Sequence, residues 1–276
     1  MRMPAYRGAK KLLAVCLAAL LLTCVAAGLA LLGGVWPEAS GDKVLKKGNI
    51  TVDASHAEQG YIMVRGKEGS QKLKLRITKG GDTYTYDLNS RGEYEVFPLQ
   101  LGSGRYTVTL YKNVKSNRYS KDGEVTVNAK LEREDAAFLC PSQYVNYTQD
   151  SAAVRMSMEL CANLSTSEEK VRAVQEFMSK GFAYDYVRAL TGPESYLGDV
   201  DGCLEKRTGL CQDFAAVAAC MLRVQGIPTQ LVIGYADDTY HAWNIVHING
   251  EYRRLDITAE LKGLARDAKY TAERIY

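Results

Sequence analysis

The segment Gly209-Leu210-Cys211-Gln212-Asp213-Phe214-Ala215 decides how the C-terminal half of the chain folds. From Cys211 to Gln225 the residues are almost all apolar, and Gly226 with Pro228 closes the run, which predicts a mostly buried helix. If the Gly-Leu pair forms the entering turn, Cys211 lies at the helix N-terminus, where unpaired backbone N–H groups and the helix dipole favour an anion. This position therefore favours a thiolate.

Three β patterns follow the helix, at Thr229 to Ala236, Tyr240 to Ile248 and Glu251 to Ile257. Asn249-Gly250 joins the last two and predicts a hairpin with a two-residue turn. In that register Trp243 faces Asp256, and His241 lies one diagonal step away on the same face. Diagonal neighbours have Cα atoms about 7–8 Å apart, within reach of an imidazole–carboxylate hydrogen bond. Cys211, His241 and Asp256 are therefore the candidate catalytic triad.

These motifs resemble the transglutaminase-like superfamily of papain-like cysteine enzymes. In bacterial members the pattern reads roughly G-x-C-Q-D-[FY]-A, then H-A-W-N-x-V-x-[IV]-[ND]-G-x-[WY], then L-D-x-T, and every fixed position is met between about residues 165 and 260. The resemblance implies acyl transfer with Cys211 as the nucleophile, His241 as the base and Asp256 as the orienting carboxylate. The backbone N–H of Cys211 is expected to help bind the oxyanion.

The candidate substrate-binding residues are Tyr184, Tyr186, Gln212 and Trp243. The two tyrosines belong to a Tyr-Asp-Tyr segment that is also similar to bacterial members. They would line the acyl-donor cleft, although burial of the rings in a core is the default explanation. Trp243 is expected beneath the triad. The loop Ala189–Thr208, which lies between the two tyrosines and Cys211 in the sequence, is expected to form a cleft wall or lid.

The resemblance leaves the second nucleophile open. Hydrolysis of a peptide or amide bond is the first choice, transamidation by a protein transglutaminase is the alternative, and a catalytically silent envelope-binding module is a third reading. Animal transglutaminases use a Trp upstream of the nucleophile, whereas this chain has none between Trp36 and Trp243. There is no carboxylate run with EF-hand spacing, so no metal and no cofactor is expected. The expected substrate is a protein, a peptide or a cell-wall peptide.

Leu12 to Trp36 is an uncharged run of 25 residues preceded by Arg2, Arg7, Lys10 and Lys11. It predicts a transmembrane signal-anchor (residues 12–36) with the catalytic part outside the cytoplasm. A signal peptide cleaved after Gly28-Leu29-Ala30, giving an extracellular secreted protein, is the alternative. The chain has 35 Lys and Arg against 32 Asp and Glu, a formal charge of +3, so charge points to no nucleic-acid partner.

Period-two apolar patterns between about Lys43 and Leu131 predict seven short strands and a β-sandwich. The strand cores are expected at Ile50/Val52, Ile62/Val64, Leu73/Leu75/Ile77, Tyr84/Tyr86/Leu88, Tyr94/Val96, Tyr106/Val108/Leu110 and Val125/Val127. Lys72, Lys74 and Arg76 would give one outer face a basic character, as a solvated surface or as a site for an anionic wall polymer.

The predicted fold class is therefore α+β, with a papain-like transglutaminase core after an Ig-like sandwich. The predicted domains are a membrane anchor or signal segment at 1–39, the β-sandwich at 40–131, a linker at 132–150 and the catalytic domain at 151–276. Helices are expected at Ser151–Asn163 and Glu168–Lys180. The pairing of Cys140, Cys161, Cys203 and Cys220 stays open, because a nucleophile must remain free and connectivity cannot be deduced from spacing.

Overall fold

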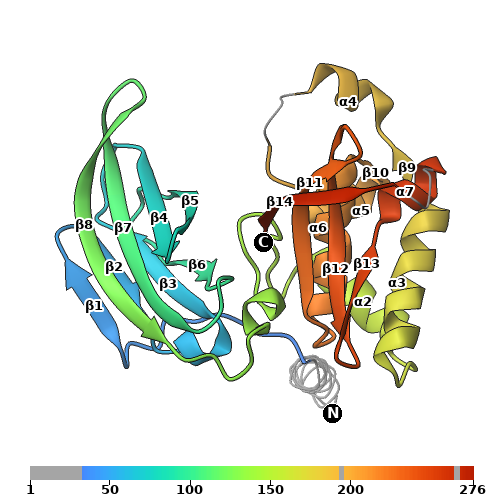
Figure 1. The fold of residues 1–276 in the computed structure, drawn as a ribbon, viewed down its shortest axis with the longest axis horizontal. Helices are drawn as coiled ribbons and strands as arrows, with labels where there is room; N and C mark the ends of the chain where they lie inside the picture. The colour runs from blue at the N-terminus through green and yellow to red at the C-terminus, as the bar shows by residue number, and fades with distance from the viewer. Residues whose placement is uncertain (1–32, 193–195, 264–267) are drawn as a thin grey trace, which may run out of the picture. The chain divides into compact units, whose positions relative to one another are not determined.

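The computed structural model describes residues 33–192, 196–263 and 268–276 (Figure 1). Residues Gly34–Tyr276 make up one structural unit. Most of the expected membrane-spanning run, 12–36, lies outside the described residues. Within the described ranges, no helix combines the length and apolar character that a bilayer crossing requires.

Between residues 33 and 130 eight strands form two antiparallel sheets of four (Figure 1). One sheet has the order β1-β2-β3-β6 and contains Val44–Lys47, Ile50–Asp53, Tyr61–Gly66 and Glu95–Pro98. The other has the order β5-β4-β7-β8 and contains Asp82–Leu88, Leu73–Lys79, Gly104–Lys115 and Arg118–Ala129. Each of the seven expected apolar patterns falls on one of β2 to β8.

The strand β1 has no counterpart among the seven expected strands, because Val44-Leu45-Lys46-Lys47 lacks apolar alternation and is mostly exposed. The alternating apolar residues of β2 to β5, β7 and β8 face inward and are buried. In β6 the expectation was wrong by one residue, because Val96 is only partly buried and its neighbour Phe97 is the buried side chain. Tyr86 of β5 packs on Phe97 of β6 with ring centroids 5.2 Å apart, so the two sheets share a core. Burial of this apolar area is the main force that holds the sheets together.

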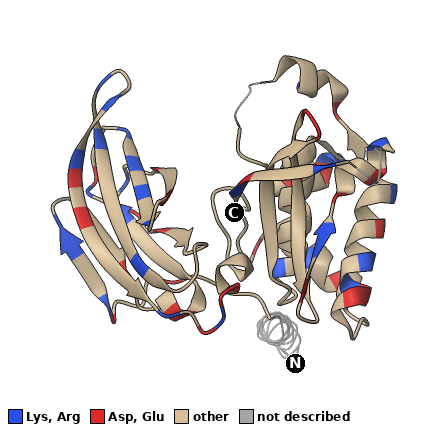
Figure 2. Cartoon of the chain, in the orientation of Figure 1, with Lys and Arg blue, Asp and Glu red and all other residues tan. Residues whose placement is uncertain are grey.

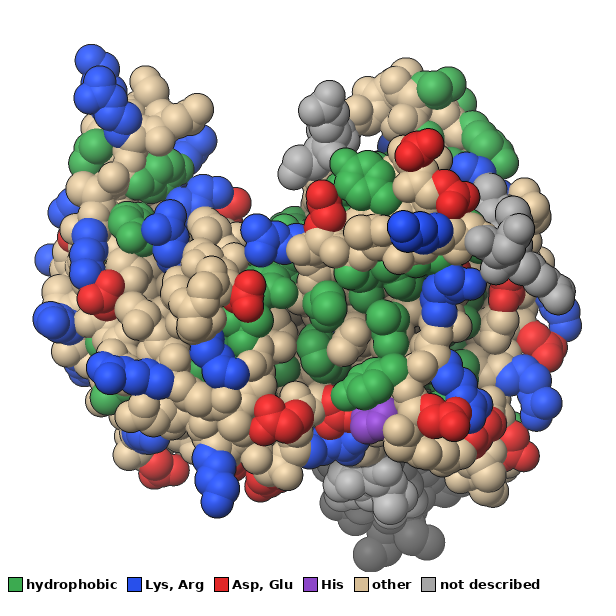
Figure 3. All heavy atoms as spheres, in the orientation of Figure 1, with side chains coloured by type: hydrophobic (Ala, Val, Ile, Leu, Met, Phe, Trp, Pro, Cys, Tyr) green, Lys and Arg blue, Asp and Glu red, His purple; other side chains and the backbone are tan. Residues whose placement is uncertain are grey.

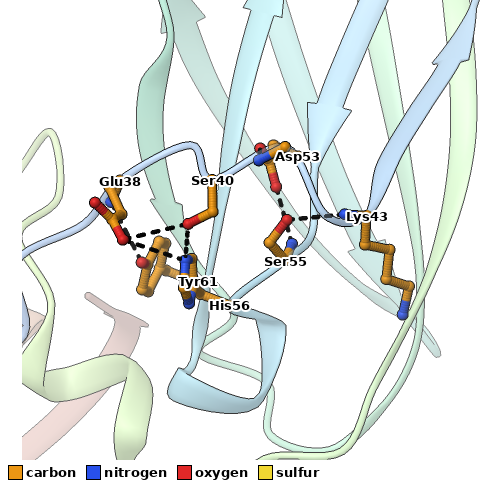
Figure 4. A network of polar contacts seen from close by, with 8 residues as sticks. Glu38, Ser40, Lys43, Asp53, Ser55, His56 and Tyr61 are labelled. Atoms are coloured by element: carbon orange, nitrogen blue, oxygen red, sulfur yellow. Dashed lines mark hydrogen bonds and ion pairs between the residues drawn. The ribbon is translucent and has the colours of Figure 1, made fainter.

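Polar contacts tie the segment before β1 to the loop after β2 (Figure 4). The Asp53 carboxylate accepts hydrogen bonds from the backbone N–H groups of Gly41, at 2.7 Å, and Ser55, at 2.9 Å. The Ser55 hydroxyl accepts from the Lys43 N–H at 2.9 Å. These bonds fix the chain direction on entering the first sheet.

Both basic and acidic residues occur along the strands of the second sheet (Figure 2). Lys74 pairs with Asp87 at 2.7 Å, and the Arg76 guanidinium lies 5.0 Å from the Tyr111 ring centroid. The space-filling view likewise shows charges of both signs dispersed over the visible face (Figure 3). Two of the basic residues expected on this face, Lys74 and Arg76, therefore already have side-chain partners within the sheet.

The segment expected as a linker, 132–150, is largely buried. It contains the 3-10 turn η2, Ala136–Leu139, in which all four residues are buried, followed by buried Cys140, Val145 and Tyr147. Its apolar residues have no regular period, because they fill gaps between elements instead of lining one face of a helix or strand.

The C-terminal half begins with helices α2, Ala152–Cys161, and α3, Ser167–Gly181. Thr166 and Glu169 form a reciprocal capping box at the start of α3. Between α3 and α6 the described residues form two short helices and two two-residue strands, namely β9 Ala183–Tyr184, α4 Tyr186–Thr191, α5 Val200–Lys206 and β10 Thr208–Gly209. The expected loop, Ala189–Thr208, therefore contains α5 and parts of α4 and β10. Asp185 and Asp199 cap the two short helices through their side chains.

Helix α6, Cys211–Arg223, packs against the antiparallel sheet β13-β12-β11-β14 (Figure 1). The elements of this sheet, with the helix α7 between the last two, are β11 Thr229–Ala236, β12 Thr239–Ile248, β13 Glu251–Leu255, α7 Ile257–Lys262 and β14 Tyr270–Ile275. Ile248 pairs with Glu251, which confirms the expected hairpin register. The turn has positive φ at both Asn249 and Gly250, as a two-residue type I′ turn requires. Strand β14 was not expected.

The last residue of α6, Arg223, is completely buried. Its guanidinium donates to the carbonyl oxygens of Thr229 at 2.9 Å, Cys140 at 2.6 Å and Tyr276 at 2.9 Å. Burial lowers the pKa of Arg223, which is the expected direction for a cation removed from water. One cation thus joins three segments that are far apart in the sequence.

Candidate active site

The turn before α6 is shaped by close packing. Gly209 lies in β10, and a Cβ added there would be 2.9 Å from both the Cys203 sulfur and the Asp213 Cβ. Any larger residue would push the turn away from the helix. Glycine is therefore required for the approach that leads directly to Cys211 at the first position of α6.

Asp213 anchors this turn from inside the protein. Its carboxylate is fully buried and accepts the Leu210 N–H at 2.9 Å, the Asp199 N–H at 3.2 Å and an Arg188 N–H at 2.6 Å. The same acidic residue fixes the turn before the helix, the start of α5 and the end of α4. The position of Cys211 consequently depends on a charge that is two residues away from it.

Cys211 differs in exposure from the other described cysteines. Cys140, Cys161, Cys203 and Cys220 are buried, and Cys211 is partly exposed. All five are free thiols in the structure. Burial raises the pKa of Cys140 and Cys203 to about 12, so these two thiols stay protonated near neutral pH.

His241 and Asp256 meet as the hairpin register requires. His241 Nε2 lies 2.7 Å from Asp256 Oδ2, and both side chains are buried. Asp256 was expected on a strand, but it is the N-cap of α7, where its Oδ1 accepts the Ala259 N–H at 2.9 Å. Strand pairing ends at Leu255 because the capping geometry turns the chain away from the sheet.

The protonation of this pair reflects competing influences. Burial alone would lower the pKa of His241, but hydrogen bonds to Asp256 and the Cys211 thiol, together with their charges, outweigh it and raise that pKa to about 9. Burial would raise the pKa of Asp256, and the bonds from His241, Ala259 and Tyr270 instead lower it. Since Asp256 occupies Nε2, Nδ1 is the ring nitrogen left for the thiol.

Tyr270 of β14 is the contact that sequence reasoning missed. Its hydroxyl donates to Asp256 Oδ2 at 2.7 Å, the same oxygen that His241 contacts. Its ring lies 5.0 Å from the Trp243 ring and 6.2 Å from the His241 ring. No local pattern marks Tyr270, because its position depends on the pairing of β14 with β11.

A cavity of about 270 Å³ opens at Cys211 and His241. Three tyrosines, Tyr184, Tyr240 and Tyr270, form part of its wall, and Lys262 brings a cation to it. The Lys262 ammonium lies 4.4 Å from the Tyr184 ring centroid. The site therefore combines a thiol, an imidazole, aromatic walls and one lysine.

The four candidate substrate-binding residues are placed differently. Tyr184 lines the cavity, and Tyr186 is 60% exposed next to it, with ring centroids 5.0 Å apart. Gln212 is buried and donates to the Tyr196 carbonyl at 2.7 Å, and its side chain does not line the cavity. Trp243 is buried and stacked on His241 at 6.1 Å, beneath the triad as expected.

Other titratable groups lie outside this cavity. His247 bonds to Asp135 and stacks on Tyr252 with ring centroids 4.3 Å apart, which places it away from His241 as a support for η2. Within the described part of the chain, no group of three or more His, Cys, Asp or Glu side chains is arranged to hold a metal ion.

The site thus combines a thiol at the start of a buried helix, a histidine on an antiparallel sheet and a carboxylate at the N-cap of the next helix, which are the groups that cysteine-dependent acyl transfer uses. Residues 155–257 match the family described as the Transglutaminase-like superfamily. The chain therefore contains a transglutaminase-like core, and this match ends before Tyr270. No curated protein matches the chain.

Solved structures show a loose similarity. A protein from Cytophaga hutchinsonii, described as a "putative cysteine protease", is 17% identical over 78% of this chain and 91% of its own length, with a TM-score of 0.40. Red sea bream transglutaminase is 14% identical over 72% of this chain, with a TM-score of 0.32. This chain spans 48% of the length of that enzyme.

Proposed function

We propose that this protein is a cysteine-dependent acyl-transfer enzyme that hydrolyses a peptide or amide bond. Cys211 attacks the carbonyl carbon, and His241 takes the thiol proton through Nδ1 and returns it to the leaving amine. Water then attacks the thioester carbonyl carbon and gives a proton to His241. The C–S bond breaks, the acid product leaves, and His241 returns the proton to the Cys211 sulfur. Asp256 keeps the imidazole oriented and stabilises the imidazolium.

The observation that carries this proposal is the contrast in exposure among the thiols. Cys211 opens onto a cavity that it shares with His241, whereas the other four described cysteines are buried. As the first residue of α6, Cys211 has a backbone N–H without a partner inside the helix, which is available to the developing oxyanion. The thiol and the oxyanion donor thus belong to one residue.

The first experiment measures thiol reactivity in the full-length protein. Iodoacetamide near neutral pH is expected to modify Cys211 before the other thiols, as located by peptide mass spectrometry. 4-Nitrophenyl acetate is expected to leave an acetyl group on Cys211. Cys211→Ala should abolish both modifications, and the matched variant Cys220→Ala, in the same helix, should retain them. Preferential modification of a buried cysteine would contradict the proposal.

The second experiment decides between hydrolysis and transamidation. The protein is given a Gln-containing peptide with a primary amine at millimolar concentration, and ammonia, free acid and amine adduct are followed by mass spectrometry. The exposure of Tyr240, 56% at the cavity wall, favours access of water and hence free acid. Three tyrosines lie around the thiol and would shield a thioester from water if the amine were preferred, so an adduct that dominates at low amine concentration would establish transglutaminase activity instead.

We further propose that the catalytic core works outside the cytoplasm, held to a membrane by residues 12–36. The uncharged run and the four basic residues before it support this proposal. The sheets before residue 130 would act as a spacer or recognition module. A C-terminal tag on intact cells should be cleaved by added protease, and the protein should stay with membranes after a high-salt wash. Release with a new N-terminus between about Ala30 and Gly41 would establish cleavage of a signal peptide.

A further inference from the structure

The Asp256 carboxylate is held from three directions. Its Oδ1 accepts the Ala259 N–H at 2.9 Å, and its Oδ2 accepts both His241 Nε2–H and the Tyr270 hydroxyl, each at 2.7 Å. Two donors on one oxygen define the plane of the carboxylate and divide its charge between them. A carboxylate that lost one donor would place more negative charge on the remaining one.

Tyr270 is itself fixed by neighbours from three strands. Its ring packs on Trp243 of β12, and the Arg254 guanidinium of β13 lies 3.9 Å from the ring centroid. Tyr270 opens β14, which pairs with β11 through Tyr270 and Ala236. The phenol therefore reaches Asp256 from a rigid position, and desolvation by burial, the bond to Asp256 and its charge raise the pKa of Tyr270 to about 12, so the hydroxyl remains a donor.

We propose that Tyr270 is a positioning residue of the Cys211-His241-Asp256 site: its hydroxyl fixes Asp256 Oδ2 against His241 and takes up part of the charge on that oxygen. The inference rests on the proposed function. In this arrangement Asp256 stabilises the imidazolium less than an unshared carboxylate would. His241 can then return its proton to the leaving amine instead of holding it.

The charged groups facing this cluster come from several elements. They are the Cys211 thiol of α6, Arg254 of β13 and Asp237 from the turn after β11, together with Lys262 of α7 at the cavity. None of them is removed when only the Tyr270 hydroxyl is deleted. Tyr270→Phe keeps the ring on Trp243 and is therefore the appropriate variant.

The test is an NMR titration of the histidine side chains in the full-length protein. The chain has three histidines, His56, His241 and His247, so isotope-labelled histidine gives three resolvable titrations. His241→Asn assigns the signal of interest, and the other two histidines serve as internal references. In Tyr270→Phe the His241 titration is expected to move upward by roughly half a pH unit, because the whole charge of Oδ2 then acts on the imidazole.

Two comparisons make the result decisive. Tyr240→Phe removes a hydroxyl from the same cavity wall but not from Asp256, so it should leave His241 unchanged. Site-specific 3-fluorotyrosine at position 270 preserves the packing and makes the phenol a stronger donor, so His241 should shift downward. The fluorinated protein also tests whether the Tyr270 hydroxyl affects the His241 titration if Tyr270→Phe folds poorly.

An unchanged His241 titration in Tyr270→Phe, or an equal shift in Tyr240→Phe, would overturn the positioning role and leave Tyr270 as a packing residue. Iodoacetamide labelling of Cys211 in the unaltered protein tests the proposed function separately. Failure of that labelling would contradict the triad as a reactive site without changing what the titration says about the contact between Tyr270 and Asp256.

Discussion

Replacement of Asp213 by Asn should destabilise the protein and disturb the thiol, although Asp213 contacts no substrate. The Asn oxygen can take the place of Oδ2 and keep its bonds to Leu210 and Arg188. Its NH₂ group then replaces Oδ1 and faces the Asp199 N–H, so two donors oppose each other. The variant loses one bond to a charged acceptor, worth about 1.5–3 kcal/mol, and the charge that paired with Arg188.

Because Arg188 is 37% exposed and can be solvated, the full penalty for breaking a buried pair does not apply, and we expect a loss of about 3 kcal/mol in total. Urea unfolding measures the free energy of unfolding, and the rate of iodoacetamide labelling reports whether the Cys211 thiol keeps its position and reactivity. The matched variant Asp185→Asn keeps a good N-cap for α4 and should change stability by less than about 0.5 kcal/mol. A loss below about 1 kcal/mol in Asp213→Asn, with labelling unchanged, would refute the anchoring role.

Three further predictions concern Asp256, His241 and Thr166. Asp256→Asn should fold but release 4-nitrophenol at least about 100-fold more slowly, because Nε2–H loses its charged acceptor; near-normal turnover would remove Asp256 from the mechanism. The pKa of His241 is raised from 6.5 to about 9 on folding, so its contribution to stability is complete below about 6.5 and is lost as pH rises through about 9. Urea unfolding at several pH values checks this, with His241→Asn as the variant in which that decline should be absent. Thr166→Ala removes the capping box of α3 and should cost about 1 kcal/mol in the same assay; no loss would mean that the box is formed but not stabilising.

Most of the strands and the hairpin register could be predicted from local sequence patterns. The Asn249-Gly250 turn, which tolerates positive φ, set the hairpin register, and the register brought His241 to Asp256. The strands β2 to β5, β7 and β8 were recognisable because one face of each is buried, which imposes alternation on the sequence. The strand β6 was found, but with Val96 expected inside where Phe97 is the buried residue. These features depend on a few neighbouring residues, so a single sequence contains them.

The missed features depend on distant partners or on very short elements. Strand β14 and its Tyr270 acquire their role only by pairing with β11, about 35 residues earlier in the chain. The short helices α4 and α5 did leave a signal, since Asp185 and Asp199 precede them as N-caps, but six or seven residues are too few for a helical period. The apolar residues of 132–150 had no period because each fills a separate gap.

The buried guanidinium of Arg223 affects how the protein unfolds. Its three acceptors are carbonyl oxygens of Cys140, Thr229 and Tyr276, so no single segment can leave without stranding a cation in an apolar interior. Partial separation would cost several kcal/mol before any chain entropy is recovered. The segment after the first two sheets, the helix that carries Cys211 and the sheet that carries His241 should therefore melt in one transition, so that loss of the thiol's reactivity on heating coincides with loss of the fold.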